Sequence, residues 1–217
     1  MPDFVTTIIA ALIGSVIGSV GAVFADYWLT QRKEKLAKRE IILQRYLFQL
    51  QDAIEMFYYR LNNVAFSAGG RVMSDEYFEV TTLYAFGKVL ALERIFLLDA
   101  VYTQLDGLYP ELGTFLRVHR LDRNVQYIDL YQYDRIALAE SIIEREGEVF
   151  RTSTYLEFRK RYEMPGSREK QWLEPAVNAI TSLSPVQIQA MLKFLKIEAD
   201  RIAKRTGIDS SLNKDHK

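Results

Sequence analysis

The stretch Val5–Ala25, with the sequence VTTIIAALIGSVIGSVGAVFA, contains 21 residues and no charge, and acidic residues flank it on both sides. As an α-helix it would span about 31 Å, close to the thickness of the hydrocarbon core of a bilayer. Tyr27 and Trp28 follow, and these residue types favour the headgroup level of a membrane. The stretch therefore predicts a single N-terminal transmembrane helix, with residues 1–29 as the anchor and the lipid bilayer as a partner.

Basic residues follow this stretch in the sequence. Five basic residues occur between Arg32 and Arg39, whereas Met1–Phe4 contains none. By the positive-inside rule, this asymmetry places the N-terminus outside and the rest of the chain in the cytoplasm. A cleaved signal peptide would carry its positive charge before the apolar core, so the charge distribution favours a retained anchor.

Small residues form a row along the predicted membrane helix. The row is spaced alternately by four and three residues and consists of Thr7, Ala11, Gly14, Gly18, Gly21 and Ala25. Small side chains let helix backbones approach closely in lipid, so this face predicts self-association into a homo-oligomer. The alternative is that glycine and alanine are simply common in membrane helices.

The helix is expected to continue beyond the membrane through residues 30–66, which form a juxtamembrane stalk and a first bundle helix. Leucines and other apolar residues recur there every seven residues, at 36, 43, 50, 57 and 64, a spacing that would suit a coiled coil. Further apolar residues widen the arc beyond a narrow seam, which indicates a helix buried in its own domain from Leu43 onward. A coiled coil stays open for the short stalk before it.

The remaining chain predicts an all-α cytoplasmic bundle over residues 74–206 and a disordered tail over residues 207–217. The predicted helices cover about 75–108, 111–120 and 133–146, the last ended by Gly147. Thr154 with Glu157 and Ser184 with Gln187 have the spacing of capping boxes, and they predict the starts of two more helices. A further helix is expected between them, from about Trp172 to Leu183.

Composition excludes several classes of function. Lys plus Arg and Asp plus Glu both number 28, so no overall basic field suggests nucleic acid as a partner. The chain has no cysteine and two histidines, and neither of the helices expected to carry paired carboxylates contains a histidine for a bundle metal site. We expect no metal, no cofactor and no residue with an assignable catalytic role.

Two segments resemble a bacterial family of membrane-anchored helical proteins to which no activity is assigned. The first is Thr82–Arg94, with Tyr-x-x-Gly-x-x-Leu followed by a glutamate, and the second is Asp134–Ile143, with Arg135 leading into Ala-x-x-Glu. The likeness spans about residues 81–180, and it departs from the family at residues 131–134. It implies a helical fold and a location in a bacterial inner membrane.

These segments also supply the candidate site, which consists of Tyr84, Glu93, Arg94, Arg135 and Glu140. We expect Glu93 to pair with Arg135, or Arg94 with Glu140, inside the bundle, because buried charges are usually paired. A polar pocket for a small ligand is the second interpretation, with an aromatic wall formed by Tyr84, Tyr127, Tyr131, Tyr133 and Tyr155. Packing in the core and at its rim is the alternative role of these tyrosines.

Two functions fit the sequence. The first is a membrane-anchored, self-associating helical module that binds a cytoplasmic protein or ligand, as a defence effector or a scaffold would. The second is a membrane-tethered enzyme with a carboxylate-based site, for which Glu93 and Glu140 on facing helices are the candidates.

Overall fold

The computed structural model describes residues 24–66, 76–121 and 128–213. Internal contacts divide the chain into two units, Met1–Ile41 and Ile42–Lys217. Most of the uncharged stretch, including Ala11, Gly14, Gly18 and Gly21, lies outside the described residues. Within the described ranges, no helix has both the length and the hydropathy needed to cross a bilayer.

In the first unit, residues 24–41 are helical and every side chain is exposed. Ala25, the last residue of the small-residue row, is one of them. The guanidinium carbon of Arg32 lies 5.3 Å from the centre of the Trp28 ring, one helical turn earlier. The structure therefore confirms a helix over the described part of the predicted stalk, and the coiled-coil interpretation of that stalk stays a prediction.

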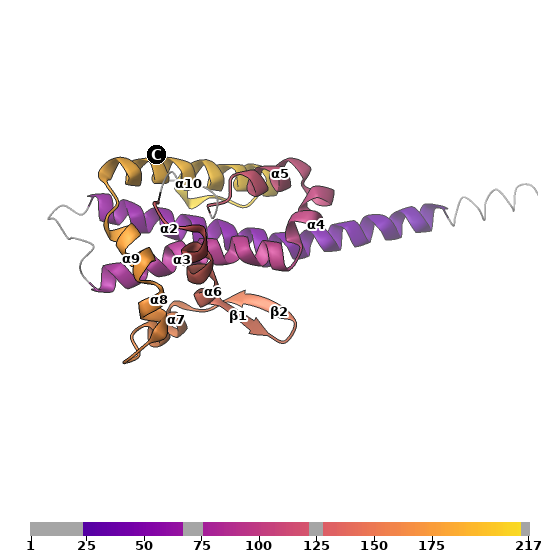
Figure 1. The fold of residues 1–217 in the computed structure, drawn as a ribbon. Coiled ribbons are helices and arrows are strands. Elements are labelled where there is room, and N and C mark those ends of the chain that lie inside the picture. The colour runs from indigo at the N-terminus through magenta and orange to yellow at the C-terminus, as the bar shows by residue number, and fades with distance from the viewer. Residues whose placement is uncertain (1–23, 67–75, 122–127, 214–217) are drawn as a thin grey trace, which may run out of the picture. The chain divides into compact units, whose positions relative to one another are not determined.

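The second unit is mostly helical, as predicted (Figure 1). A π-helical turn, η1 (Leu43–Leu47), leads into α2 (Phe48–Phe66). Then follow α3 (Glu76–Leu98), α4 (Val101–Leu108), α5 (Pro110–Val118) and α6 (Gln132–Ile142). A hairpin of β1 (Ile143–Glu146) and β2 (Val149–Thr152) precedes α7 (Tyr155–Tyr162), α8 (Arg168–Trp172), α9 (Glu174–Thr181), α10 (Pro185–Thr206) and the short 3₁₀ helix η2 (Ser211–Asn213).

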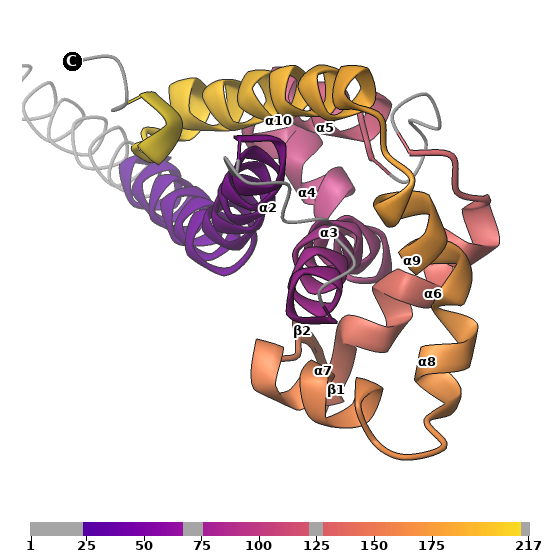
Figure 2. The same cartoon turned by 90° about the vertical axis from the view of Figure 1, so that its left-hand side faces the viewer.

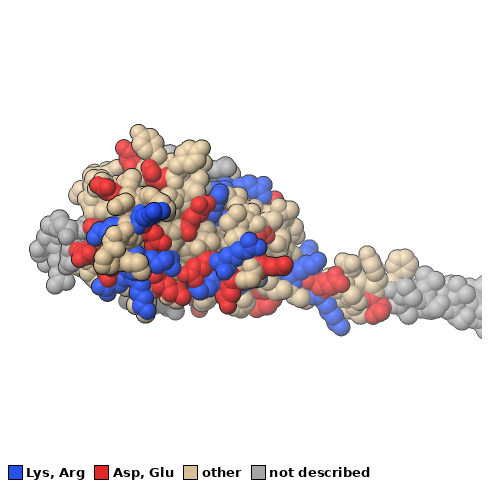
Figure 3. Space-filling model, turned by 60° about the horizontal axis from the view of Figure 1, so that its bottom comes forward, with Lys and Arg blue, Asp and Glu red and all other residues tan. Residues whose placement is uncertain are grey.

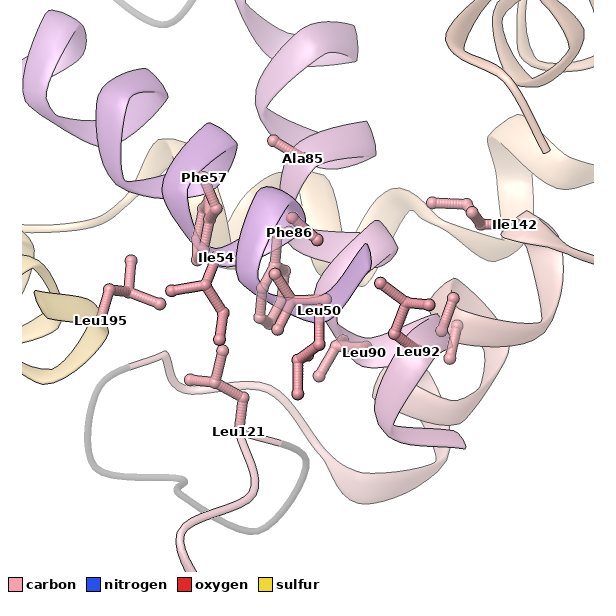
Figure 4. Close-up of a cluster of buried hydrophobic side chains, with 14 of the residues drawn as sticks. Leu50, Ile54, Phe57, Ala85, Phe86, Leu90, Leu92, Leu121, Ile142 and Leu195 are labelled. Atoms are coloured by element: carbon pink, nitrogen blue, oxygen red, sulfur yellow. The ribbon is translucent and has the colours of Figure 1, made fainter. Parts of the chain in front are cut away.

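Helix α2 lies between α10 and α3 and carries the centre of the core (Figures 1 and 2). Leu50, Ile54 and Phe57 of α2 are at most 2% exposed, and they lie among Phe86 and Leu90 of α3 and Leu195 of α10 (Figure 4). The rings of Phe57 and Phe86 stack with centres 5.3 Å apart. The broad apolar arc after Leu43 thus packs within the chain's own domain, which confirms the prediction of a buried first bundle helix.

Helices α3 and α6 approach each other at Gly87. A Cβ atom built on Gly87 would lie 2.5 Å from Cδ1 of Ile142 and 2.9 Å from Cδ1 of Leu138. Contacts this short do not occur between non-bonded carbon atoms, so a side chain at this position would have to displace Ile142 and Leu138 of α6. This explains in physical terms the glycine of the Tyr-x-x-Gly segment.

The predicted helix over residues 75–108 is in fact two helices. Ala100 adopts a left-handed conformation with φ of 52°, and α4 begins directly after it. The hydroxyl of Tyr46 donates to Oδ2 of Asp99 at 2.9 Å, which ties the break to η1. Because neither glycine nor proline marks this position, the sequence pattern continued through it and the prediction was wrong here.

The predicted helix over residues 133–146 is also wrong in its second half. Helix α6 ends at Ile142, and a hairpin pairs Ile143 with Thr152 and Glu146 with Val149. Gly147, expected to end a helix, begins the hairpin turn with φ of 65°. Ion pairs of Arg151 with Glu144 and Glu146 across the strands favour this local pairing over helix.

The hairpin is tied to the helices that follow it. Arg161 of α7 lies 2.9 Å from a carboxylate oxygen of Glu144 and 3.2 Å from one of Glu169 in α8. Positive and negative side chains are interspersed over the lower face of the domain, where α7, α8 and the hairpin lie (Figures 1 and 3). The hairpin is thus an integral part of the domain.

The two predicted capping boxes are confirmed. Thr154 with Glu157 caps α7, and Ser184 with Gln187 caps α10. The predicted disorder from residue 207 is wrong for residues 208–213, because Leu212 is 3% exposed and the amide of Ser211 donates to Glu55 at 3.2 Å. Leu212 and Ile208 pack against the core, and Glu55 and Tyr59 of α2 bind Ser211.

Candidate functional site

The structure separates the five predicted site residues into three places. Arg94 and Glu140 form the predicted contact, with Nη2 3.2 Å from Oε1. Their side chains are 33% and 55% exposed, so the pair lies at the surface and not inside the bundle as expected. An exposed pair of this kind contributes at most about 1 kcal/mol to stability.

Glu93 and Arg135 hold the connection between α5 and α6. Glu93 is 4% exposed, and its Oε1 accepts a hydrogen bond from the amide of Leu121 at 2.7 Å. Arg135 is 2% exposed and donates to the carbonyls of Leu121 and Ile128, both at 3.2 Å. Both side chains therefore bind the backbone of the α5–α6 connection, which gives them a structural role.

The environment of Glu93 favours its neutral form. Burial raises the pKa of Glu93 to about 8, although the Leu121 amide and the positive charges of Arg120 and Arg135 act to lower it. Burial likewise lowers the pKa of Arg135, and the negative charges of Glu93 and Asp129 oppose that change.

Glu198 of α10 is a second buried carboxylate, which sequence reasoning missed. It is 3% exposed, and within the described ranges its Oε1 has no hydrogen-bond partner. Burial raises the pKa of Glu198 well above its ordinary value, the negative charge of Glu93 raises it further, and Arg201 lowers it. The available signal was its helical position, three residues after Leu195 and four before Ile202, on the apolar face of α10.

Glu93 and Glu198 are expected to make the fold less stable as the pH rises from 5 to 8. An unfolded glutamate titrates near pH 4.3, so over this range the folded chain binds protons that the unfolded chain has lost. The contribution of the two protonated glutamates to stability is complete below pH 4 and disappears as the pH passes their raised pKa in the folded state. Between these limits, the free energy of unfolding falls by up to about 1.4 kcal/mol per pH unit for each group.

The measurement is thermal unfolding of the full chain between pH 5.5 and pH 8.5. Glu198→Gln should have a flatter profile than the wild type and a higher melting temperature at pH 8, because the amide cannot ionise. Glu148→Gln is the matched control, since Glu148 is exposed in the hairpin turn. A wild-type melting temperature that rises with pH over this range would contradict the assignment.

Tyr84 lies in a different place, a groove of about 400 Å³ between α2, α3 and the first residue of α7. Its lining consists of Met56, Tyr59, Arg60, Asn63, Thr81, Tyr84, Ala85 and Tyr155. We refer to this as the Tyr84 groove. The hydroxyl of Tyr84 donates to the carbonyl of Ser153 at 2.9 Å, and its ring meets that of Tyr155 edge-on with centres 5.5 Å apart. Burial raises the pKa of Tyr84 to about 12, so its hydroxyl stays protonated.

The aromatic wall is therefore only partly the predicted one. Tyr84 and Tyr155 belong to it, Tyr131 and Tyr133 are each 84% exposed elsewhere, and Tyr127 lies outside the described residues. Sequence reasoning missed the contribution of α2, although its residues at 56, 59, 60 and 63 have the spacing of one helix face.

No protein-family model, curated protein or solved structure matches this chain. The resemblance noted above thus rests on the residues of its two segments. In the described part of the chain, no group of three or more His, Cys, Asp or Glu side chains is placed to hold a metal ion. The Tyr84 groove is lined by phenol, guanidinium, amide and hydroxyl groups, which suits binding better than acid–base chemistry between carboxylates.

Proposed function

We propose that this protein is a membrane-anchored, self-associating helical module whose cytoplasmic domain binds a small ligand in the Tyr84 groove. The observation that carries the ligand-binding part is the groove itself, in which aromatic, apolar and polar side chains from α2, α3 and α7 converge. Such mixed lining is typical of small-molecule sites.

The uncharged stretch Val5–Ala25 and the basic residues between Arg32 and Arg39 support anchoring in a bacterial inner membrane with the N-terminus outside. The described helix after Ala25 is exposed throughout, which fits a stalk. A C-terminal reporter enzyme that works only in the periplasm should be inactive on this chain, and an active one would refute the orientation.

A membrane-tethered enzyme with a carboxylate-based site has less support. Among the described residues, no carboxylate lines the Tyr84 groove. Of the two candidate glutamates, Glu93 is buried and accepts a hydrogen bond from the Leu121 amide, whereas Glu140 is exposed in an ion pair with Arg94. Binding of a ligand or a cytoplasmic partner is therefore the function that we propose.

Filling the groove should abolish ligand binding. Thr81 lines it and donates through Oγ1 to the carbonyl of Tyr77 in its own helix, so Thr81→Trp places an indole in the groove without removing a tertiary hydrogen bond. We expect a fragment screen by saturation-transfer NMR, on the full chain in nanodiscs, to give signals that this variant loses.

The matched control is Thr181→Trp, because Thr181 is exposed on α9 and makes the same bond one turn back, to Val177 at 2.9 Å. Fragments that bind the groove should keep their signals in this variant. A screen in which no fragment distinguishes Thr81→Trp from the wild type would refute ligand binding in the groove.

Self-association is expected to depend on the small residues of the membrane stretch. Gly14→Ile and Gly18→Ile should each weaken it, because a branched side chain prevents close approach of two backbones. Crosslinking in membranes measures the effect, with Val16→Leu as the comparison. Unchanged crosslinking in both glycine variants would leave the anchor without a role in assembly.

A further inference from the structure

We propose that the ligand of the Tyr84 groove is a small aromatic carboxylate, whose carboxylate group is bound by the guanidinium of Arg60 and the hydroxyl of Tyr155. This inference rests on the proposed function, since it names the chemical class of ligand for the same groove. Three features of the lining support it. In the part of the chain that the structure describes, Arg60 has no carboxylate partner and the buried hydroxyl of Tyr155 has no hydrogen-bond partner, and an aromatic surface lies beside them.

Arg60 is held in one orientation by neutral groups. Its Nε donates to Oγ1 of Thr82 at 3.1 Å, and Nη2 donates to the carbonyl of Phe78 at 3.3 Å. Its guanidinium carbon lies 4.5 Å from the centre of the Phe78 ring and 5.5 Å from that of Tyr77. Thr82 and Phe78 use Nε and one hydrogen of Nη2, so Nη1 and the second hydrogen of Nη2 are the donors left for a ligand.

The charge of Arg60 is not balanced within the described residues. Arg60 is half-buried, and in the described ranges no carboxylate lies within ion-pairing distance of it. Burial lowers the pKa of Arg60, and Tyr77 and Tyr155 act to raise it. Buried charges in proteins are usually paired, and a planar guanidinium edge suits a carboxylate in a bidentate arrangement. A carboxylate bound in the groove would give Arg60 the direct counterion that the described residues do not supply.

Tyr155 provides a second, independent indication. Its hydroxyl oxygen is buried, and no hydrogen-bond partner for it occurs among the described residues. Burial raises the pKa of Tyr155, and the positive charges of Arg159 and, to a smaller extent, Arg60 lower it, so the hydroxyl is protonated and can donate at neutral pH. A buried hydroxyl without a partner costs stability, and a bound carboxylate would accept its hydrogen bond.

The rest of the lining fits an aromatic body. Met56, Ala85 and the rings of Tyr59 and Tyr84 form the apolar part of the groove. Aromatic rings pack edge-on against tyrosines, and a thioether makes favourable contacts with a ring. A volume of about 400 Å³ suits a one- or two-ring compound with a short acidic arm better than a large cofactor.

The test compares 3-phenylpropionate with its neutral amide, 3-phenylpropanamide, by equilibrium dialysis against the full chain in nanodiscs. The Thr81→Trp variant in the same nanodiscs provides the background from partition into lipid. We expect the wild type to bind the carboxylate at least about tenfold more tightly than the amide, as is typical for a charge-assisted hydrogen bond.

Arg60→Met should remove this preference and leave amide binding within about twofold of the wild type. Arg45→Met is the matched control, because Arg45 is also half-exposed on a helix and stacks on a tyrosine, 5.3 Å from the centre of the Tyr46 ring. The control should bind both compounds as the wild type does.

Tyr155→Phe separates ligand binding from folding. Because the buried hydroxyl has no partner among the described residues, its removal should leave the melting temperature unchanged or raise it, while affinity for the carboxylate falls severalfold. A purely structural tyrosine would leave the affinity unchanged.

Equal wild-type affinity for carboxylate and amide, or an unchanged preference in Arg60→Met, would overturn the inference. Fragments that Thr81→Trp excludes but that are all neutral would overturn it too, while leaving the proposed function intact. If Thr81→Trp excludes no fragment at all, the proposed function fails together with the inference.

Discussion

Glu93→Ala is expected to destabilise the domain by about 3 kcal/mol or more, through two effects that add. Truncation leaves a cavity at a side chain that is 4% exposed, and large-to-small changes in a core typically cost about 2–5 kcal/mol. It also leaves the amide of Leu121 without the acceptor that now lies 2.7 Å away, which adds about 1–3 kcal/mol. The α5–α6 connection then loses a buried side chain that binds its backbone at Leu121.

Thermal unfolding of the full chain measures this effect, and for a domain of this size we expect the melting temperature to fall by about 6–12 °C. Glu93→Gln is the matched control, because its amide oxygen can still accept from Leu121. The control should lose about 1 kcal/mol or less. A catalytic glutamate would behave differently, and an unshifted melting temperature in Glu93→Ala would return Glu93 to the candidate functional groups.

The helices of this domain could be predicted where local signals and burial agree. Ser184 and Gln187 marked the start of α10 because a capping box is formed by residues three apart. The apolar residues from Leu47 to Leu61 cover a wider arc than the apolar stripe of a surface helix, so they predicted a buried helix. In both cases the information lies within one or two helical turns of sequence.

The features that escaped prediction depend on contacts between distant segments. Ala100 takes a left-handed conformation although nothing in its own chemistry favours it. The hairpin strand Ile143–Glu146 reads as a continuation of α6 until its partner Val149–Thr152 is considered. The intrinsic propensities of residues 143–146 are similar for helix and strand, and pairing with the second strand decides between the two.

The candidate site, like the fold, could be predicted only in part. Tyr84 and Tyr155 were proposed as one wall, and the structure brings their rings together. Arg60 and Tyr59 were missed because the face of α2 that lines the groove is defined only by the placement of α3 and α7. Glu93 and Glu140 were the candidates for the alternative carboxylate site, but Glu93 is buried against the Leu121 amide and Glu140 is 55% exposed beside Arg94.

Gly87→Leu is expected to destabilise the domain by about 3 kcal/mol, because overpacking at the contact of α3 and α6 forces the two helices apart. Even the Cβ of an alanine would lie 2.5 Å from Cδ1 of Ile142 and 2.9 Å from Cδ1 of Leu138. Gly87→Ala should be milder, since the gain in helix propensity of about 1 kcal/mol offsets part of the clash.

The same reasoning predicts that Gly→Ala changes the melting temperature in opposite directions at two glycines. A Cβ on Gly107 of α4 would meet no atom within 4 Å, so Gly107→Ala should raise the melting temperature where Gly87→Ala lowers it.

Ile142→Val removes the Cδ1 atom nearest to the new side chain, so Gly87→Ala combined with Ile142→Val should lose less stability than the sum of the two single changes. Additive losses in this double-mutant cycle, or an unchanged melting temperature in Gly87→Leu, would mean that α3 and α6 do not meet at Gly87. In that case the glycine of the Tyr-x-x-Gly segment would need a role other than packing.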